Sequence, residues 1–330
     1  MAHTVGRWMC SWTMNVVFGP PGALRVYGRG LSYDFYERSC PQVEMLVQQG
    51  LESVFISDPT TPAALLRLLF HDCQVQGCDA SILLDDNGGN RSSEMVSARN
   101  FGVRGRESIG MIKSMLEVAC PLTVSCADII ALAAREAVAA SGGPHIRVPL
   151  GRRDAVSSSY SLADASLPSA DTGVDGMLQI FAAKGMSVEE SVAILGAHTI
   201  GITHCINIID QQHKPESSDY SNLAESQTRM FLKFSCPKEI PAAKSIFVGN
   251  DLTSFAFDNQ LYRDTIGGRG VLRIDSDMAV DPRTASIVQH FAIDQAYFFQ
   301  AFSSAFVKLS SDGVLTGNEG GMRRSCNRIG

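Results

Sequence analysis

Apolar residues recur at helical rather than alternating spacing over much of this chain. Apolar positions repeat at intervals of three and four in the clearest stretches, residues 108–120, 125–140 and 285–309. Such spacing places the apolar side chains on one face of a helix, which can then pack against a core. Glycine and proline stand where these helices should end, at residues 141–144, 167–169 and 267–270. The pattern therefore predicts a mostly α fold without internal repeats.

One predicted helix carries two side chains that can act together. It opens at Thr61 and Pro62, because proline is favoured in the first turn of a helix. Arg67 and His71 then lie one turn apart on the same face. A guanidinium and an imidazole above one spot suit a reaction that removes a proton, returns it elsewhere and builds negative charge in between. Cleavage of a peroxide is such a reaction.

A second helix is predicted to begin at Ser187. Glu190 stands three residues later, which completes a capping box, and apolar residues follow at helical spacing. This helix leads to His198. An ordered helix can hold a side chain that follows it to a tight tolerance.

Size and charge limit the class of protein. The 330 residues can form one large domain or two medium ones, and either would hold a buried cofactor. The net charge of -6 and the pI of about 5.7, without any block of Lys or Arg, argue against nucleic acid as a partner. No apolar run reaches the length of about 18 residues expected of a membrane span, so no membrane partner is expected.

The cysteines and the N-terminus point to secretion. Nine cysteines without CxxC pairs favour an oxidising compartment, although sequence alone does not fix their pairing. Residues 1–30 contain Arg7 and an interrupted apolar run at residues 8–18, which predicts a weak secretory leader before a domain at residues 31–330. The triplet that starts at Asn90 is a glycosylation acceptor and agrees with an extracellular address.

The densest motif is Arg67-Leu-Leu-Phe-His-Asp-Cys-Gln-Val-Gln-Gly-Cys-Asp-Ala-Ser81. Together with Leu195-Gly-Ala-His-Thr-Ile-Gly201, it resembles the secreted class III plant haem peroxidases, and the likeness runs from about Leu31 to the end of the chain. The resemblance implies two helical lobes around one haem b. The distal lobe would cover about residues 31–170 and the proximal lobe about residues 171–300, with a C-terminal segment that returns to the distal lobe.

The resemblance also implies an activity and a covalent framework. The chain would be a secreted monomer that reduces hydrogen peroxide to water and oxidises small phenolic donors in one-electron steps. The family pattern pairs eight of the cysteines in four disulfides, namely Cys40 with Cys120, Cys73 with Cys78, Cys126 with Cys326, and Cys205 with Cys236.

Catalytic roles follow from the same resemblance. On the distal side of the haem, His71 would move the proton, Arg67 would stabilise developing charge, and Phe70 would act as a wall. On the proximal side, His198 would bind the iron through one ring nitrogen. Asp275 would accept a hydrogen bond from the other nitrogen, with Asp277 as the less favoured alternative.

Two calcium ions are implied by oxygen donors near these histidines. The first would be held by Asp72, Val75, Gly77, Asp79 and Ser81, with Glu94 acting through a water molecule. The second would be held by Thr199, Asn250, Asp251, Thr253, Ala256 and Asp258. The family has Asp where this chain has Asn250, so a charge is lost unless Asp251 shifts into the site.

The chain departs from the family pattern in two further places. The family segment after the glutamate contains a Pro-Asn pair whose Asn orients the distal histidine, and the segment from Glu94 to Phe101 is expected to lack that pair. Asn87 or Asn90 could substitute only if the loop folds back, so a slower reaction with peroxide is expected. Pro168 matches the proline that contacts phenolic donors, but the aromatic residues that often line this entrance are replaced by Ala170, Asp171, Ile206 and Asn207.

These departures leave alternatives open. One is a haem- and calcium-binding extracellular protein with impaired turnover, and another is a calcium-dependent binding domain without haem. Four other histidines have no ligand-like partners and receive no role, namely His145, His204, His213 and His290.

Overall fold

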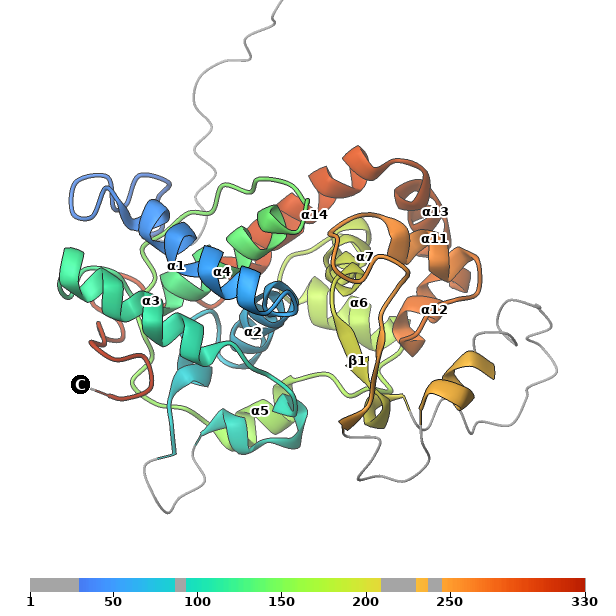
Figure 1. The fold of residues 1–330 in the computed structure, drawn as a ribbon, viewed down its shortest axis with the longest axis horizontal. Helices are drawn as coiled ribbons and strands as arrows, with labels where there is room; N and C mark the ends of the chain where they lie inside the picture. The colour runs from blue at the N-terminus through green and yellow to red at the C-terminus, as the bar shows by residue number, and fades with distance from the viewer. Residues whose placement is uncertain (1–29, 87–92, 209–229, 237–244, 330) are drawn as a thin grey trace, which may run out of the picture.

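The computed structural model describes residues 30–86, 93–208, 230–236 and 245–329, and these are mostly helical, as the periodicity predicts (Figure 1). The predicted leader, Cys10 and the acceptor Asn90 lie outside the described residues. The helices labelled in Figure 1 are α1 (Val43–Ser57), α2 (Thr61–Val75), α3 (Arg106–Ala119), α4 (Cys126–Ala140), α5 (Tyr160–Ser166), α6 (Val174–Ala182), α7 (Val188–Leu195), α11 (Gln260–Ile266), α12 (Arg273–Val280), α13 (Ala285–Ile293) and α14 (Gln295–Ser310).

Short elements connect these helices. One antiparallel pair of strands is formed by β1 (Ile202–His204) and β2 (Phe247–Gly249), in which His204 stands opposite Phe247. Single turns of 3-10 helix occur at η1 (Ser81–Leu83), η2 (Glu94–Val96), η3 (Ala98–Asn100), η4 (Gly196–Thr199) and η5 (Cys205–Asn207).

The predicted helical stretches correspond to observed helices, with one difference. The stretch at 285–309 forms two helices, because Asp294 separates α13 from α14 and its carboxylate caps α14 by accepting a hydrogen bond from Tyr297 N at 2.9 Å. At α7 the predicted capping box is present, with both hydrogen bonds between Ser187 and Glu190.

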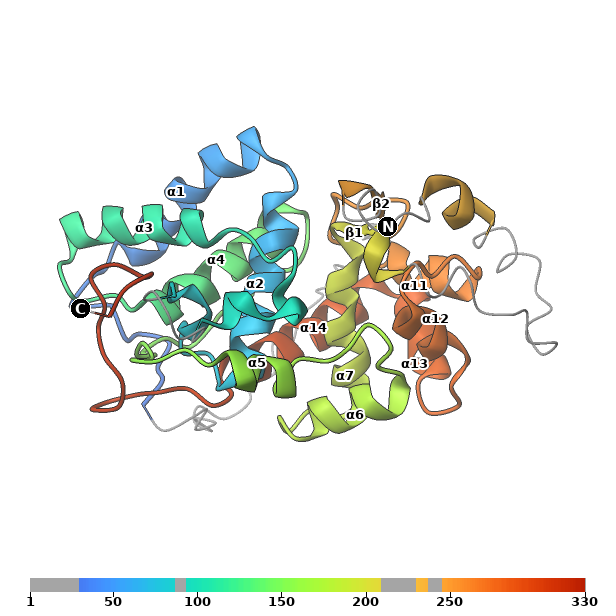
Figure 2. The ribbon, with the colours of Figure 1, turned by 90° about the horizontal axis from the view of Figure 1, so that it is seen from below.

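The helices form two groups that lie side by side in both views (Figures 1 and 2). Helices α1 to α5 make up one group, while α6, α7 and α11 to α13 make up the other. Helix α14 runs between the groups, and the segment after it returns to the first group beside α3 (Figures 1 and 2). The disulfide between Cys126 and Cys326 fixes this return.

Large apolar side chains fill the interior of both groups. Helix α2 packs on α4 through leucines that are fully buried, Leu65, Leu68 and Leu69. On α14, Phe298 and Phe302 pack around Phe257, with ring centroids 5.8 and 4.7 Å from that of Phe257. Burial of each such side chain stabilises the fold by about 1.5–3 kcal/mol, so α2 and α14 are held firmly.

All four predicted disulfides are present. The bonds join Cys40 with Cys120, Cys73 with Cys78, Cys126 with Cys326, and Cys205 with Cys236. The short Cys73–Cys78 loop directly follows the part of α2 that carries His71, so this bond limits the movement of the candidate site.

Candidate active site

Helix α2 brings Arg67 and His71 together as their spacing predicts. Arg67 Nε donates a hydrogen bond to His71 Nε2 at 3.1 Å, and Arg67 Nη2 donates to the carbonyl oxygen of Phe101 at 3.0 Å. The imidazole of His71 is buried, whereas Arg67 and Phe70 are half-buried. A nitrogen that accepts a hydrogen bond carries a lone pair, so Nε2 of His71 is placed to take a proton.

The second nitrogen of His71 has a partner that the sequence analysis missed. His71 Nδ1 lies 2.6 Å from Asn100 Oδ1, and Asn100 Nδ2 donates to the carbonyl oxygen of Glu94 at 2.8 Å. Because the amide nitrogen of Asn100 is used as a donor, its oxygen must accept, and the proton of the neutral imidazole therefore sits on Nδ1. Asn100 fixes both the orientation and the tautomer of His71.

The expectation that this segment lacks an orienting asparagine is therefore wrong. Asn100 stands six residues after Glu94, at the end of η3, and the residue before it is Arg99 instead of the expected proline. Because Arg99 replaces the proline, the Pro-Asn pair of the family could not be recognised in the sequence. The available signal was an asparagine directly before Phe101 within the segment that follows Glu94. The substitutes considered from sequence, Asn87 and Asn90, lie outside the described residues.

Burial sets the charge state of His71. Removal from water, and then the charge of Arg67, lower the pKa of His71 to about 3, although the bond to Asn100 acts in the opposite direction. The imidazole is therefore neutral near pH 7, the state in which it accepts a proton.

The proximal pair also forms. His198 lies in η4, directly after the capped helix α7, and its Nδ1 is 2.9 Å from Oδ1 of the buried Asp275 at the start of α12. Asp277 instead accepts a hydrogen bond from Arg273 at 3.2 Å. Burial disfavours the charged form of His198, but the carboxylate of Asp275 outweighs it, so the pKa of His198 is raised.

Part of the His198 ring is accessible, and the ring lies within electrostatic reach of Arg67. Although burial is the largest influence on its pKa, 30% of the His198 side chain remains accessible to water. The charge of Arg67 also lowers the pKa of His198, which requires the two side chains to lie within electrostatic reach. Phe70 of α2 packs against Phe181 of α6, with ring centroids 6.3 Å apart. The helix that carries His71 therefore contacts α6, which packs on α7, the helix that leads to His198.

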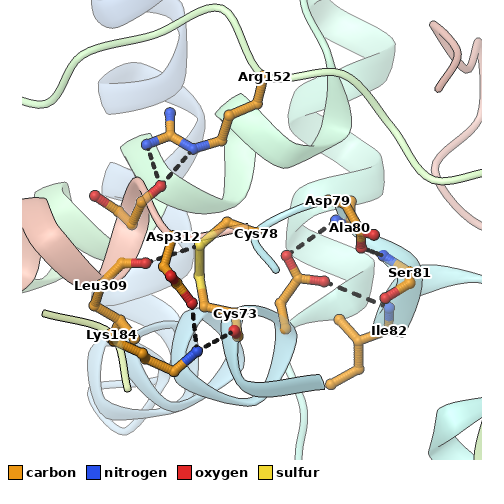
Figure 3. Close-up of a disulfide and its surroundings, with 12 residues drawn as sticks. Cys73, Cys78, Asp79, Ala80, Ser81, Ile82, Arg152, Lys184, Leu309 and Asp312 are labelled. Atoms are coloured by element: carbon orange, nitrogen blue, oxygen red, sulfur yellow. Dashed lines mark hydrogen bonds and ion pairs between the residues drawn. A yellow bond between two sulfur atoms is a disulfide. The ribbon is translucent and has the colours of Figure 1, made fainter. Parts of the chain in front are cut away.

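The loop predicted to bind the first calcium ion is buried and rich in oxygen (Figure 3). Backbone N–H groups of Ala80 and Ser81 donate to Asp72 and Asp79 at 2.9 Å each. Gly77 adopts φ of 121°, and a side chain there would strike the backbone of Gly313, so only glycine fits. The loop is thus held between the end of α2 and the segment after α14.

This loop leaves oxygen atoms without partners. Ser81 Oγ and Glu94 Oε2 are buried and have no hydrogen-bond partner within the described part of the chain. Burial, and then nearby carboxylates, raise the pKa values of Asp72 and Asp79, and burial raises that of Glu94 to about 7. Among the described residues, no three acidic, histidine or cysteine side chains converge as a metal group by themselves. Hydroxyl and backbone oxygens, such as those expected from Val75 and Gly77, would have to complete a calcium shell.

The second predicted calcium cluster forms around Thr199. Thr199 Oγ1 donates to Asp251 Oδ2 at 2.7 Å and to Asp258 Oδ1 at 3.2 Å, and Thr253 Oγ1 donates to Asp258 Oδ1 at 3.1 Å. The N–H of Ala256 donates a hydrogen bond to the carbonyl oxygen of Thr253 at 2.7 Å. Two carboxylates and two hydroxyls therefore meet in this cluster, and one of the hydroxyls belongs to the residue that follows His198.

The side-chain amide of Asn250 is engaged outside this cluster. Its Oδ1 accepts from Thr203 at 2.7 Å, and its Nδ2 donates to the carbonyl oxygen of His198 at 3.0 Å. Asp251 takes the place in the cluster instead, so the negative charge expected there is kept. Burial raises the pKa of Asp251 to about 6, as expected for a carboxylate crowded by others without a cation.

Pro168, predicted to contact phenolic donors, lies next to α5. Pro168 is half-buried just after α5, and α5 packs against η2, η3 and α2. Beside it Ala170 and Asp171 are exposed, so no aromatic side chain follows Pro168 there.

Helices that carry a histidine and arginine opposite a second, carboxylate-bound histidine have the arrangement expected of a haem peroxidase. Comparison with known proteins agrees: the family model described as "Peroxidase" matches residues 47–294. Peroxidase 29 of Arabidopsis thaliana is 55% identical over 304 residues, which cover 91% of this chain and 89% of that protein. Peroxidase 46 and Peroxidase 18 of the same organism are 40% and 39% identical, each over 91% of both chains. The chain belongs to the peroxidase family, and it is an enzyme of that class.

Proposed function

We propose that this peroxidase reduces hydrogen peroxide to water and draws the electrons from small phenolic donors in one-electron steps. The observation that carries the proposal is the pair of oriented imidazoles: His71 is held by Asn100 beside Arg67, and His198 is held by Asp275. A proton acceptor and a metal ligand are both needed for this reaction, and each ring presents its Nε2 for one of these tasks.

One haem b per chain fits these residues. The Nδ1 proton of His198 is taken by Asp275, which leaves Nε2 to bind iron, and the buried carboxylate increases the basicity of the ring. Partly buried apolar side chains next to both histidines, such as Phe70 and Ala197, suit an apolar macrocycle. Bound haem would supply the iron at which peroxide is reduced.

The distal side chains would handle the proton and the charge. His71 Nε2 would take the proton from one peroxide oxygen and deliver it to the other, so that water can leave. Arg67 would stabilise the negative charge on the departing oxygen, a task for which one well-placed donor is worth about 3 kcal/mol. Asn100 would keep the lone pair of His71 pointed at the peroxide, and Phe70 would limit access to the reacting oxygen.

Two calcium ions per chain would support this geometry. The first would be bound by the oxygen-rich loop after α2, where Ser81 Oγ and Glu94 Oε2 have no other described partner. The second would be bound by the cluster around Thr199, with Asp251 replacing Asn250. Each ion adjoins one of the two histidines, so each would stiffen one side of the site.

The proposed setting is outside the cell, where the protein would act as a monomer. Four disulfides suit an oxidising compartment. Within the ranges that the structure describes, no helix has both the length and the apolar character needed to cross a bilayer.

Reconstitution with haem and calcium tests the function. The protein should gain the absorbance band of bound haem, and guaiacol oxidation should require hydrogen peroxide. His71→Leu should keep the haem and lose most of the peroxide turnover, whereas Tyr36→Phe, which removes a buried hydrogen bond elsewhere, should behave as wild type. A protein that binds haem yet consumes no peroxide would instead be the impaired haem- and calcium-binding protein. Asn100 removes one of the two reasons for that alternative, which were a missing orienting partner for His71 and an altered donor entrance.

A further inference from the structure

Three aromatic side chains form a cluster that the sequence analysis did not predict. The ring of His204 lies between those of Phe101 and Phe247, with centroid distances of 5.8 and 6.2 Å and steep interplanar angles of 64° and 80°. Phe247 and His204 are cross-strand neighbours in the β1–β2 pair, so the strand register fixes their contact. We call Phe101, His204 and Phe247 the aromatic triad.

The triad is open to solvent. Phe101 is 38% exposed and Phe247 is 52% exposed, and each keeps part of its ring accessible although it contacts His204. His204 is half-buried, and its Nδ1 is buried without a hydrogen-bond partner among the described residues. The exposed rings of Phe101 and Phe247 suit a ligand that carries an aromatic ring.

The triad also adjoins the distal side chains. Phe101 directly follows Asn100, and its carbonyl oxygen accepts the hydrogen bond from Arg67 Nη2 at 3.0 Å. Gly102 stands between Arg67 and His204: a methyl group on it would lie 3.4 Å from Arg67 Nη1 and 3.7 Å from His204 Cδ2. A molecule resting on the triad would therefore be separated from Arg67 by little more than the width of one residue.

The triad differs in position from the expected entrance. Phe101 comes from the first group of helices, while His204 and Phe247 come from the strand pair in the second group, so the triad bridges the two. At that entrance the family's aromatic residues are replaced, since Ala170, Asp171 and Asn207 are exposed and carry no ring.

We propose that the aromatic triad binds the ring of the phenolic donor and thereby sets donor preference. This inference rests on the proposed function. In that reaction, two phenol molecules each lose one electron and one proton, and one hydrogen peroxide molecule gains two electrons and two protons to give two waters. The triad offers ring contacts for the phenol, and Arg67 offers a polar group near its hydroxyl.

Donor comparison with Phe247→Ala tests the proposal. Guaiacol serves as the aromatic donor and ferrocyanide as a one-electron donor without a ring. An aromatic contact is worth about a twofold to tenfold change in affinity, so the guaiacol KM should rise by about that factor relative to the ferrocyanide KM. Phe247→Tyr, which keeps a ring, should restore the wild-type ratio. Phe101→Ala provides a second variant, since it keeps the carbonyl that binds Arg67.

Phe234→Ala is the matched control, because Phe234 is 86% exposed and makes none of the ring contacts of the triad. Titration calorimetry of guaiacol without peroxide measures binding apart from turnover, and Phe247→Ala should raise the dissociation constant by a similar factor. An unchanged dissociation constant and KM ratio in both triad variants would overturn the proposal, as would an equal loss with both donors. If wild type oxidises neither donor, the proposed function fails, while the calorimetric comparison still decides whether the triad binds phenols.

Discussion

Replacement of Asn100 by alanine tests the central feature of the distal site. In the structure, Asn100 Oδ1 accepts the Nδ1 proton of His71 over 2.6 Å, at a position where both residues are buried. Alanine leaves that N–H without a partner and frees the ring to turn or to exchange its tautomer. An unsatisfied buried donor costs about 1–3 kcal/mol. If this cost falls on the orientation required for proton transfer, peroxide cleavage slows by about fivefold to about 150-fold.

Stopped-flow mixing of the haem-loaded protein with hydrogen peroxide measures this rate directly. The haem content of Asn100→Ala should remain that of wild type, because His198 and Asp275 are untouched. Tyr36→Phe is the matched control: it removes the buried hydrogen bond that the Tyr36 hydroxyl donates to Asp128 at 2.7 Å and the one that it accepts from Ser125 N at 3.4 Å, but it lies away from His71. Its stability should fall by a similar amount while its peroxide rate stays unchanged.

A double variant makes the test sharper. If Asn100 acts only through His71, then adding Asn100→Ala to His71→Leu should cause no further loss, since there is no imidazole left to orient. A folded, haem-loaded Asn100→Ala protein that reacts as fast as wild type would refute the assigned role. So would an additive loss in the double variant, because it would show that Asn100 acts on the reaction by another route.

Three further predictions follow from the other parts of the site. His198→Ala should lose haem on gel filtration, whereas His71→Leu should retain it, and equal retention would contradict the assignment of the two rings. Chelation of calcium should slow peroxide turnover reversibly, and Asp251→Asn should lower the metal content by about one ion per chain, measured by atomic emission. Lys308 and the cap of α7 lower the pKa of Glu190 despite its burial, so this carboxylate adds stability above pH 4.5 that is lost as pH falls through its lowered pKa. Glu190→Gln should therefore lower the free energy of unfolding by about 1 kcal/mol at neutral pH. The difference from wild type should shrink as the pH falls.

The helical fold was largely predictable because its signals are local. Apolar spacing and the Ser187 capping box depend on residues within a few positions of one another, and both reappear in the structure. The break at Asp294 was missed because apolar residues continue on both sides of it. The available signal was Asp294 itself, because aspartate is favoured at the N-terminus of a helix.

The contacts within the site were less predictable because they join distant segments. Asn100 reaches His71 across 29 residues, and its geometry depends on the path of the segment that begins at Glu94. The choice between Asn250 and Asp251 depends on which side chain points toward Thr199, and alternation of side chains along an extended segment reverses with a shift of one residue. Sequence motifs indicate which kinds of side chain are needed at these positions. The fold determines which of two neighbouring residues supplies that side chain.

One short segment links the separate parts of the proposed reaction. Glu94 lies beside the first calcium loop through its side chain and binds Asn100 through its carbonyl. Asn100 holds His71, and the next residue, Phe101, binds Arg67 through its carbonyl and supplies a ring to the aromatic triad. A shift of this segment would therefore alter proton transfer, charge stabilisation and donor contact together. Calcium removal should consequently change the guaiacol KM as well as the peroxide rate, whereas loss of Phe247 alone should change only the ratio between donors.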